Sequence, residues 1–136
     1  MSVPKDKRGH GQLEVNAAAL DLCTYTMIIT ANEKIFTNAQ KEFTTKLRDT
    51  ALEIHLLCWE ANNIKVDGNT DRYLRRIELQ QIAADHCNRM CALIEVAKPL
   101  FHLSSKRCIY WIQKAVTLRA MIRAWSASDF KRLKPA

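Results

Sequence analysis

Cysteine and histidine side chains are the first candidates for chemistry in this chain. Cys87 and Cys91 are four residues apart, so a helix would present both thiols on one face, with His86 beside them. Thiolate and imidazole groups are the usual ligands of zinc. Structural zinc sites, however, commonly take two ligands from a tight turn, and every cysteine here lies on or beside an apolar stripe, where a free thiol packs as a small hydrophobic group. We therefore expect neither a metal nor another cofactor.

The remaining histidines and the carboxylates show no catalytic spacing. His55 and His102 lack the regularly spaced partner that a di-iron Glu-x-x-His site requires. Asp49, Glu53 and Glu60 are typical of a solvated acidic face, or of salt bridges to another subunit. No Gly-rich phosphate loop, Gly-x-Ser-x-Gly elbow or His-Glu-x-x-His motif occurs. The sequence therefore predicts a protein that is not an enzyme.

Basic side chains are the most prominent functional groups. The 136 residues include 21 Lys and Arg against 14 Asp and Glu, a formal net charge of +7. The excess lies in the second half, where residues 69–136 hold 13 basic and 5 acidic groups. The stretch from Ser105 to Ser128 has no acidic residue, so no ion pair within one helix can neutralise its cations. Polyanions, namely nucleic acid or an anionic membrane surface, are therefore the favoured partners.

The placement of these cations predicts a nucleic-acid interface. Several of them fall in the first turns of predicted helices, where each opposes the helix dipole by ~0.3–1 kcal/mol, so helix stability alone would not select them. In an antiparallel bundle, many of them also gather at one pole. The residues predicted to contact nucleic acid are Arg72, Arg75, Arg76, Lys106, Arg107, Lys114, Arg119, Arg123, Lys131 and Arg132. Tyr73, Tyr110 and Trp125 would add base stacking if exposed, although aromatic residues at helical spacing more often belong to a core. The alternative is a solvated basic face that maintains solubility.

Helices must position these side chains. Breaks occur in a tail through Gly11 and near residues 37–38, 67–69 and 104–105, and between them apolar residues recur at steps of three and four. Thr37-x-x-Gln40 predicts a capping box, Asn69 or Thr70 and Ser104 predict helix caps, and Pro99 predicts a kink or an end near Lys98. We expect an all-α, up-down-up-down four-helix bundle over residues 12–128, a basic flexible tail at 1–11 and a basic C-terminal tail at 129–136.

A second apolar stripe runs along three of the four helices. In the last helix it includes Ile109, Ile112 and Val116, which we predict to form the contact between subunits of a homo-oligomer. A wider core within a single subunit is the alternative explanation.

Composition also predicts the compartment. No apolar run approaches the ~20 residues of a membrane span, and the first eleven residues lack the apolar region of a signal peptide. An odd number of cysteines, five, fits a reducing environment. We expect a cytoplasmic protein with free thiols and no membrane segment.

Several short runs resemble a known family. They are LRDTALEI at 47–54, EANN at 60–63, RYL at 72–74, AKPLFHL at 97–103 and IRAW at 122–125. With the four heptad-like helices they resemble, over roughly residues 12–128, the four-helix-bundle family of the accessory variability determinants of diversity-generating retroelements (Avd-like proteins) and of proteins encoded in 23S rRNA intervening sequences. The resemblance implies a strongly basic homopentamer that binds nucleic acid and, in the retroelement branch, supports a reverse transcriptase in mutagenic cDNA synthesis. Many members have a glycine pair before the last tryptophan, where this chain has Arg123 and Ala124.

Together these features predict a non-catalytic, basic, homo-oligomeric RNA-binding accessory protein. Its partners would be RNA or an RNA/DNA hybrid, with a reverse transcriptase and a pentameric assembly implied by the resemblance. The alternative is an oligomeric protein-interaction scaffold that docks an acidic protein and has no direct nucleic-acid role.

Overall fold

Four helices make up almost the whole described chain. The computed structural model describes the backbone of residues 3–133 and the side chains of residues 12–133. The helices are α1 (Val3–Thr30), α2 (Lys41–Asn62), α3 (Thr70–Phe101) and α4 (Ser105–Lys131), and a 3-10 turn, η1 (Asn38–Gln40), precedes α2. No strand occurs within residues 3–133. The predicted all-α class is confirmed.

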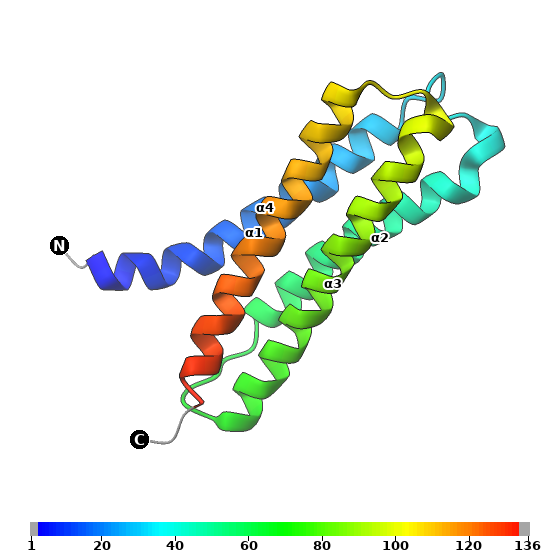
Figure 1. The fold of residues 1–136 in the computed structure, drawn as a ribbon. Helices are drawn as coiled ribbons and strands as arrows, with labels where there is room; N and C mark the ends of the chain where they lie inside the picture. Colours follow the sequence, from blue (N-terminus) through cyan, green and yellow to red (C-terminus); the bar gives the residue numbers. More distant parts are fainter. Residues whose placement is uncertain (1–2, 134–136) are drawn as a thin grey trace.

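The helices surround one core (Figure 1). α1 and α3 each pack against α2 and α4, whereas the two diagonal pairs make no close backbone approach in the described part of the chain. Figure 1 shows that each helix starts at the end of the molecule where the preceding one finishes, and that the N-terminal turns of α1 extend away from the other helices. The α3–α4 pair therefore forms a continuous two-helix surface.

The predicted core stripes are buried. Leu22, Leu47 and Ile122 are fully buried, and Trp111 lies at the centre among aromatic neighbours. The Trp111 Nε1–H donates to Thr26 Oγ1 at 3.0 Å, and the Thr26 hydroxyl donates to the Leu22 carbonyl at 2.8 Å. The buried indole and hydroxyl are thus both hydrogen-bonded, as buried polar groups generally are.

Two of the three predicted helix caps are present in the structure. Asn69 Oδ1 accepts from the Arg72 N–H and Ser104 Oγ from the Arg107 N–H, both at 3.1 Å. The predicted capping box at Thr37 and Gln40 is wrong, because neither side chain makes a cap hydrogen bond. The Gln40 N–H instead bonds to the Thr37 carbonyl at 3.0 Å, so a tight 3-10 turn starts this segment.

The end of α3 lies shortly after Pro99. The helix runs through Pro99 to Phe101 and ends at His102, whose backbone is left-handed with φ 56°. The Leu103 N–H then bonds to the Lys98 carbonyl at 2.9 Å, which closes the helix by a C-terminal capping turn.

Both predicted tails are shorter than expected. α1 begins at Val3, so most of the predicted tail at 1–11 is helical. Pro4 suits the first turn of a helix, and helix propagation from the packed turns beyond residue 12 is favourable. At the other end α4 continues to Lys131 and Asp129 is fully buried, so the predicted boundary at residue 129 is wrong. Residues 134–136 lie outside the described part.

The second apolar stripes divide into two groups. In α3 its members Ile77, Ala84 and Cys87 are buried inside the subunit and widen the core. In α1, by contrast, Leu13 and Leu20 stay exposed. A wide core thus explains most of the α3 stripe, and the α1 and α4 stripes only in part, through the buried Cys23 and through Ile112, which packs against the core.

None of the helices within residues 3–133 combines the length and the apolar character that crossing a bilayer demands.

Candidate nucleic-acid interface

A buried ion pair joins α3 to the last turn of α4. Arg76 is 4% exposed and Asp129 is fully buried. Arg76 Nε donates to Asp129 Oδ2 at 2.7 Å, its Nη2 donates to Oδ1 at 2.5 Å, and Gln80 Nε2 donates to Oδ2 at 2.8 Å. The prediction that Arg76 contacts phosphate is therefore wrong, because its guanidinium is enclosed and committed to a carboxylate.

Helical register explains this burial. Arg76 lies seven residues before Ala83 and Asp129 lies seven residues after Ile122, so each continues a core stripe of its own helix. The guanidinium also lies over the rings of Tyr73 and Trp125, at 5.6 and 5.5 Å from their centroids. Trp125 is buried and Tyr73 is half-buried, so neither offers the free face expected for base stacking.

Two other predicted cations of α3 are exposed but partnered. Arg75 bonds to Glu78 at 2.6 Å and approaches Glu60 at 3.4 Å. Arg72 donates to the Lys65 carbonyl at 2.9 Å and lies 3.8 Å from the Asp67 carboxylate. Exposed pairs of this kind are weak and a phosphate could compete with them, but they lower the local positive potential.

Three predicted cations of the C-terminal region also have partners. Lys114 pairs with Asp21 of α1 at 2.5 Å and lies over the Tyr110 ring. Arg119 is half-buried and donates to Asn88, and Arg132 lies 3.3 Å from the Asp129 carboxylate.

Four predicted cations remain without a side-chain hydrogen bond or ion pair among the described residues. They are Lys106, Arg107, Arg123 and Lys131, all on α4, and all exposed except the half-buried Arg107. The acidic residue of α4 is the buried Asp129, which Arg76 neutralises. The solvent side of α4 therefore carries positive charge only, and this helix is the best candidate interface.

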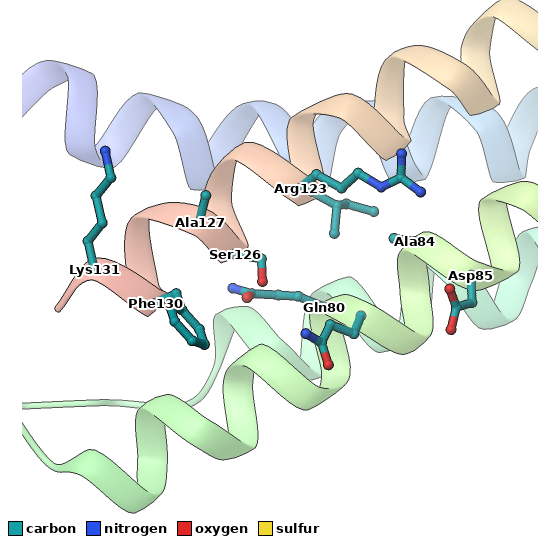
Figure 2. Close-up of a pocket in the computed structure, with 10 residues that line it drawn as sticks. Gln80, Ala84, Asp85, Arg123, Ser126, Ala127, Phe130 and Lys131 are labelled. Carbon is teal, nitrogen blue, oxygen red and sulfur yellow. The ribbon is translucent and has the colours of Figure 1, made fainter. Parts of the chain in front are cut away.

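A groove of about 610 Å³ follows the C-terminal half of this surface (Figure 2). Its walls are mainly apolar and come from α3 and α4, with Ile122 and Phe130 among them. Arg123 and Lys131 extend from the α4 side, as Figure 2 shows, and Asp85 stands on the α3 side. Phe130 is 58% exposed. Phe130 was not among the predicted contacts because the predicted bundle ends at residue 128, although residues 109, 116, 123 and 130 share a seven-residue spacing.

A second recess of about 760 Å³ lies where α4 begins, near α1. Lys106, Arg107 and the exposed Tyr110 line it, and Tyr25 of α1 packs edge-on against Tyr110 with 5.3 Å between ring centroids. Cationic and aromatic groups thus occur together at both ends of α4.

The predicted subunit contact is only partly exposed. Ile109 and Val116 are 56% and 37% exposed, whereas Ile112 is half-buried and packs against the core. Exposed apolar residues also follow α2, where Leu52, Leu56 and Trp59 recur at steps of four and three. These three residues were not among the predicted contact residues.

The cysteines are free thiols in the structure. Burial raises the pKa of both Cys58 and Cys87 from 9.0 to about 12. Within the described residues no three His, Cys, Asp or Glu side chains gather as a metal site would require, and Cys87 is turned into the core.

Comparisons with known proteins add no further assignment, since no protein-family model, curated protein or solved structure matches the chain.

Proposed function

We propose that this chain is a non-catalytic RNA-binding accessory protein that contacts phosphate through α4. The observation that supports the proposal is the charge of that helix. Its solvent side presents Lys106, Arg123 and Lys131, while Asp129 is buried beside Arg76. Release of the counterions condensed on a nucleic acid makes binding to such a surface favourable. An RNA or an RNA/DNA hybrid would serve as the partner.

The proposal includes an oligomer of up-down-up-down bundles in which α4 of one copy packs on α2 of the next. α4 offers Ile109 and Val116 close to cations, and α2 offers Leu56 and Trp59 close to Asp49, Glu53 and Glu60. Apolar area would meet apolar area and opposite charges would meet at the rim. Since two different faces meet, the contact is heterologous and can close into a ring, with a pentamer as the size implied by the family resemblance.

The resemblance of the short runs to Avd-like proteins supports the more specific part of the proposal. In that role the protein would assist a reverse transcriptase during mutagenic cDNA synthesis, and the basic surface would hold the template RNA or the hybrid.

The RNA-binding proposal can be tested by removing two cations. We expect the Arg123→Gln, Lys131→Gln variant to bind RNA at least about tenfold more weakly, because charged hydrogen bonds to phosphate are lost. The slope of log K against log salt should become shallower by about 0.7–0.9 for each lost contact. Fluorescence anisotropy over a salt series measures both quantities.

A matched control keeps the change in net charge the same. Lys34 and Lys41 are exposed near the α1–α2 connection, and replacing both with Gln should leave RNA affinity close to that of the wild type. If the two double variants lose affinity equally, α4 is not the interface. If the wild type binds no RNA, the protein-interaction scaffold becomes the better explanation.

The oligomer is tested by charge in the apolar contact. Ile109→Asp with Val116→Asp should give monomers by light scattering at micromolar concentration, because buried carboxylates would be unpaired in the contact. Leu56→Asp with Trp59→Asp should do the same.

Mixing the two variants should restore dimers, since each retains one intact face. The control is Val96→Asp, which is exposed on α3 and should leave assembly unchanged. A monomeric wild type would contradict the proposal.

A further inference from the structure

We propose that the groove between α3 and α4 binds an unstacked nucleobase of single-stranded RNA, with Phe130 as the stacking platform. This inference rests on the proposed function and specifies which part of the nucleic acid the C-terminal half of α4 recognises. The groove (Figure 2) is defined by Gln80, Ala84 and Asp85 on α3 and by Arg123, Ser126 and Phe130 on α4.

The exposed phenyl ring is the first argument. Phe130 is 58% exposed and lies apart from Ile109 and Val116, the exposed apolar residues of α4 that the proposed subunit contact uses. In Figure 2 its ring lies over the space between the end of α4 and α3. An aromatic face beside cations is the usual arrangement of single-strand binding surfaces, because any base can stack on it while the cations hold the backbone.

An unsatisfied acceptor in the groove wall is the second argument. Gln80 is 1% exposed, and its Nε2 donates to Asp129 Oδ2 at 2.8 Å. This bond fixes the orientation of the amide, and Gln80 Oε1 is left buried without a hydrogen-bond donor. Unpaired buried acceptors are rare and unfavourable. The Watson–Crick edge of a base carries N–H donors, and a base that enters the groove could supply one through a small side-chain displacement.

The charges beside the groove determine on which side the RNA backbone lies. Arg123 and Lys131 are eight residues apart on α4, which is about 12 Å along a helix, and they lie on either side of Phe130 in sequence. Asp85 lines the α3 side of the groove. Phosphates are therefore favoured along α4 and disfavoured along α3, which places the backbone over α4 and the base toward the groove.

Three probes of equal length separate the base from the phosphates. They are single-stranded oligoadenylate, an abasic strand with the same phosphates, and duplex RNA. We expect the wild type to prefer oligoadenylate over the abasic strand by about five- to hundredfold, the range that one stacked base supplies. Phe130→Ala should abolish this preference and leave binding to the abasic strand and the duplex unchanged. Circular dichroism would check folding, which should survive because the ring is exposed.

Two substitutions identify the origin of the preference. Phe130→Trp should keep it and Phe130→Leu should lose most of it, because leucine retains apolar area without an aromatic face. The matched control is Ile28→Ala, which removes an exposed apolar side chain of α1, 72% exposed, and should change nothing.

The outcomes distinguish this inference from the proposed function. A wild type that binds none of the three probes contradicts the proposed function. A wild type that binds oligoadenylate and the abasic strand equally contradicts the nucleobase site alone. Retention of the preference in Phe130→Ala, or an unchanged preference in Phe130→Leu, also overturns the nucleobase site, the second because it would show simple apolar docking.

Discussion

Replacing Asp129 with Asn is expected to lower the free energy of unfolding by about 3–5 kcal/mol, the cost of leaving one partner of a buried ion pair uncompensated. Arg76 is 4% exposed and has no other carboxylate in reach within the described residues. Asparagine keeps the shape, but its amide nitrogen replaces one acceptor oxygen, so the loss reports both the missing charge and the hydrogen bonds to that oxygen. Urea unfolding followed by circular dichroism measures the difference.

The control is the same substitution at an exposed carboxylate. Asp21 pairs with Lys114 across α1 and α4 with most of its side chain in solvent, so Asp21→Asn should cost about 0–1 kcal/mol. The double variant Arg76→Met, Asp129→Leu should recover much of the loss, since both charges are then removed and apolar groups fill the space. Equal losses of unfolding free energy for Asp129→Asn and Asp21→Asn would contradict the assignment of Arg76 and Asp129 as a buried ion pair.

The same ion pair also shapes the candidate site. Asp129 precedes Phe130 and Lys131 and anchors their turn to α3 through Arg76 and Gln80. Loss of that anchor would free the last turn of α4 and open the groove. We therefore expect Asp129→Asn to weaken the oligoadenylate preference even at temperatures where the protein remains folded.

The helices were predictable because the signal for them is local. Apolar residues at steps of three and four place Leu22, Ile54 and Leu118 in one core, and these positions are buried. The ends were predicted less well, because they depend on contacts outside the local window. Asp129 looks like the start of a polar tail until the stripe is extended by seven residues from Ile122, where it meets Arg76.

The sequence predicted which helix forms the candidate interface, but not which residues of that helix are available for binding. The lack of acids between Ser105 and Ser128 identified α4 from sequence alone. Which cations stay available depends on partners far away in sequence, such as Asp21, which neutralises Lys114 at a separation of 93 residues. The rotation of each helix about its own axis determines which of its side chains meet those of a neighbouring helix. The periodicity of apolar residues gives no information on such pairs.

Alkaline pH is expected to unfold this protein through its buried thiols. Burial holds the pKa of Cys58 and of Cys87 at about 12, against 9.0 for an ordinary thiol. Between these values the unfolded chain releases protons that the native state keeps, so stability falls as pH rises. Each thiol contributes about 1.4 kcal/mol per pH unit, so the pair should lower the free energy of unfolding by roughly 3 kcal/mol per unit between pH 9 and 12. Urea titrations at pH 8, 9, 10 and 11 measure this slope.

Removing the two most strongly shifted thiols should remove most of the slope. The Cys58→Ala, Cys87→Ala variant loses some packing at pH 8, yet its stability should fall less between pH 9 and 11 than that of the wild type. Burial also raises the pKa of Cys23, Cys91 and Cys108, so these thiols keep a part of the slope. The native thiols should also resist iodoacetamide at pH 8, because a pKa three units higher lowers the thiolate fraction about a thousandfold. Rapid labelling of Cys58 in the folded protein, or the same pH slope in both proteins, would show that these side chains are reached by water. The core formed by α2 and α3 would then be open, and the closed packing that holds Arg76 and the groove in place would fail with it.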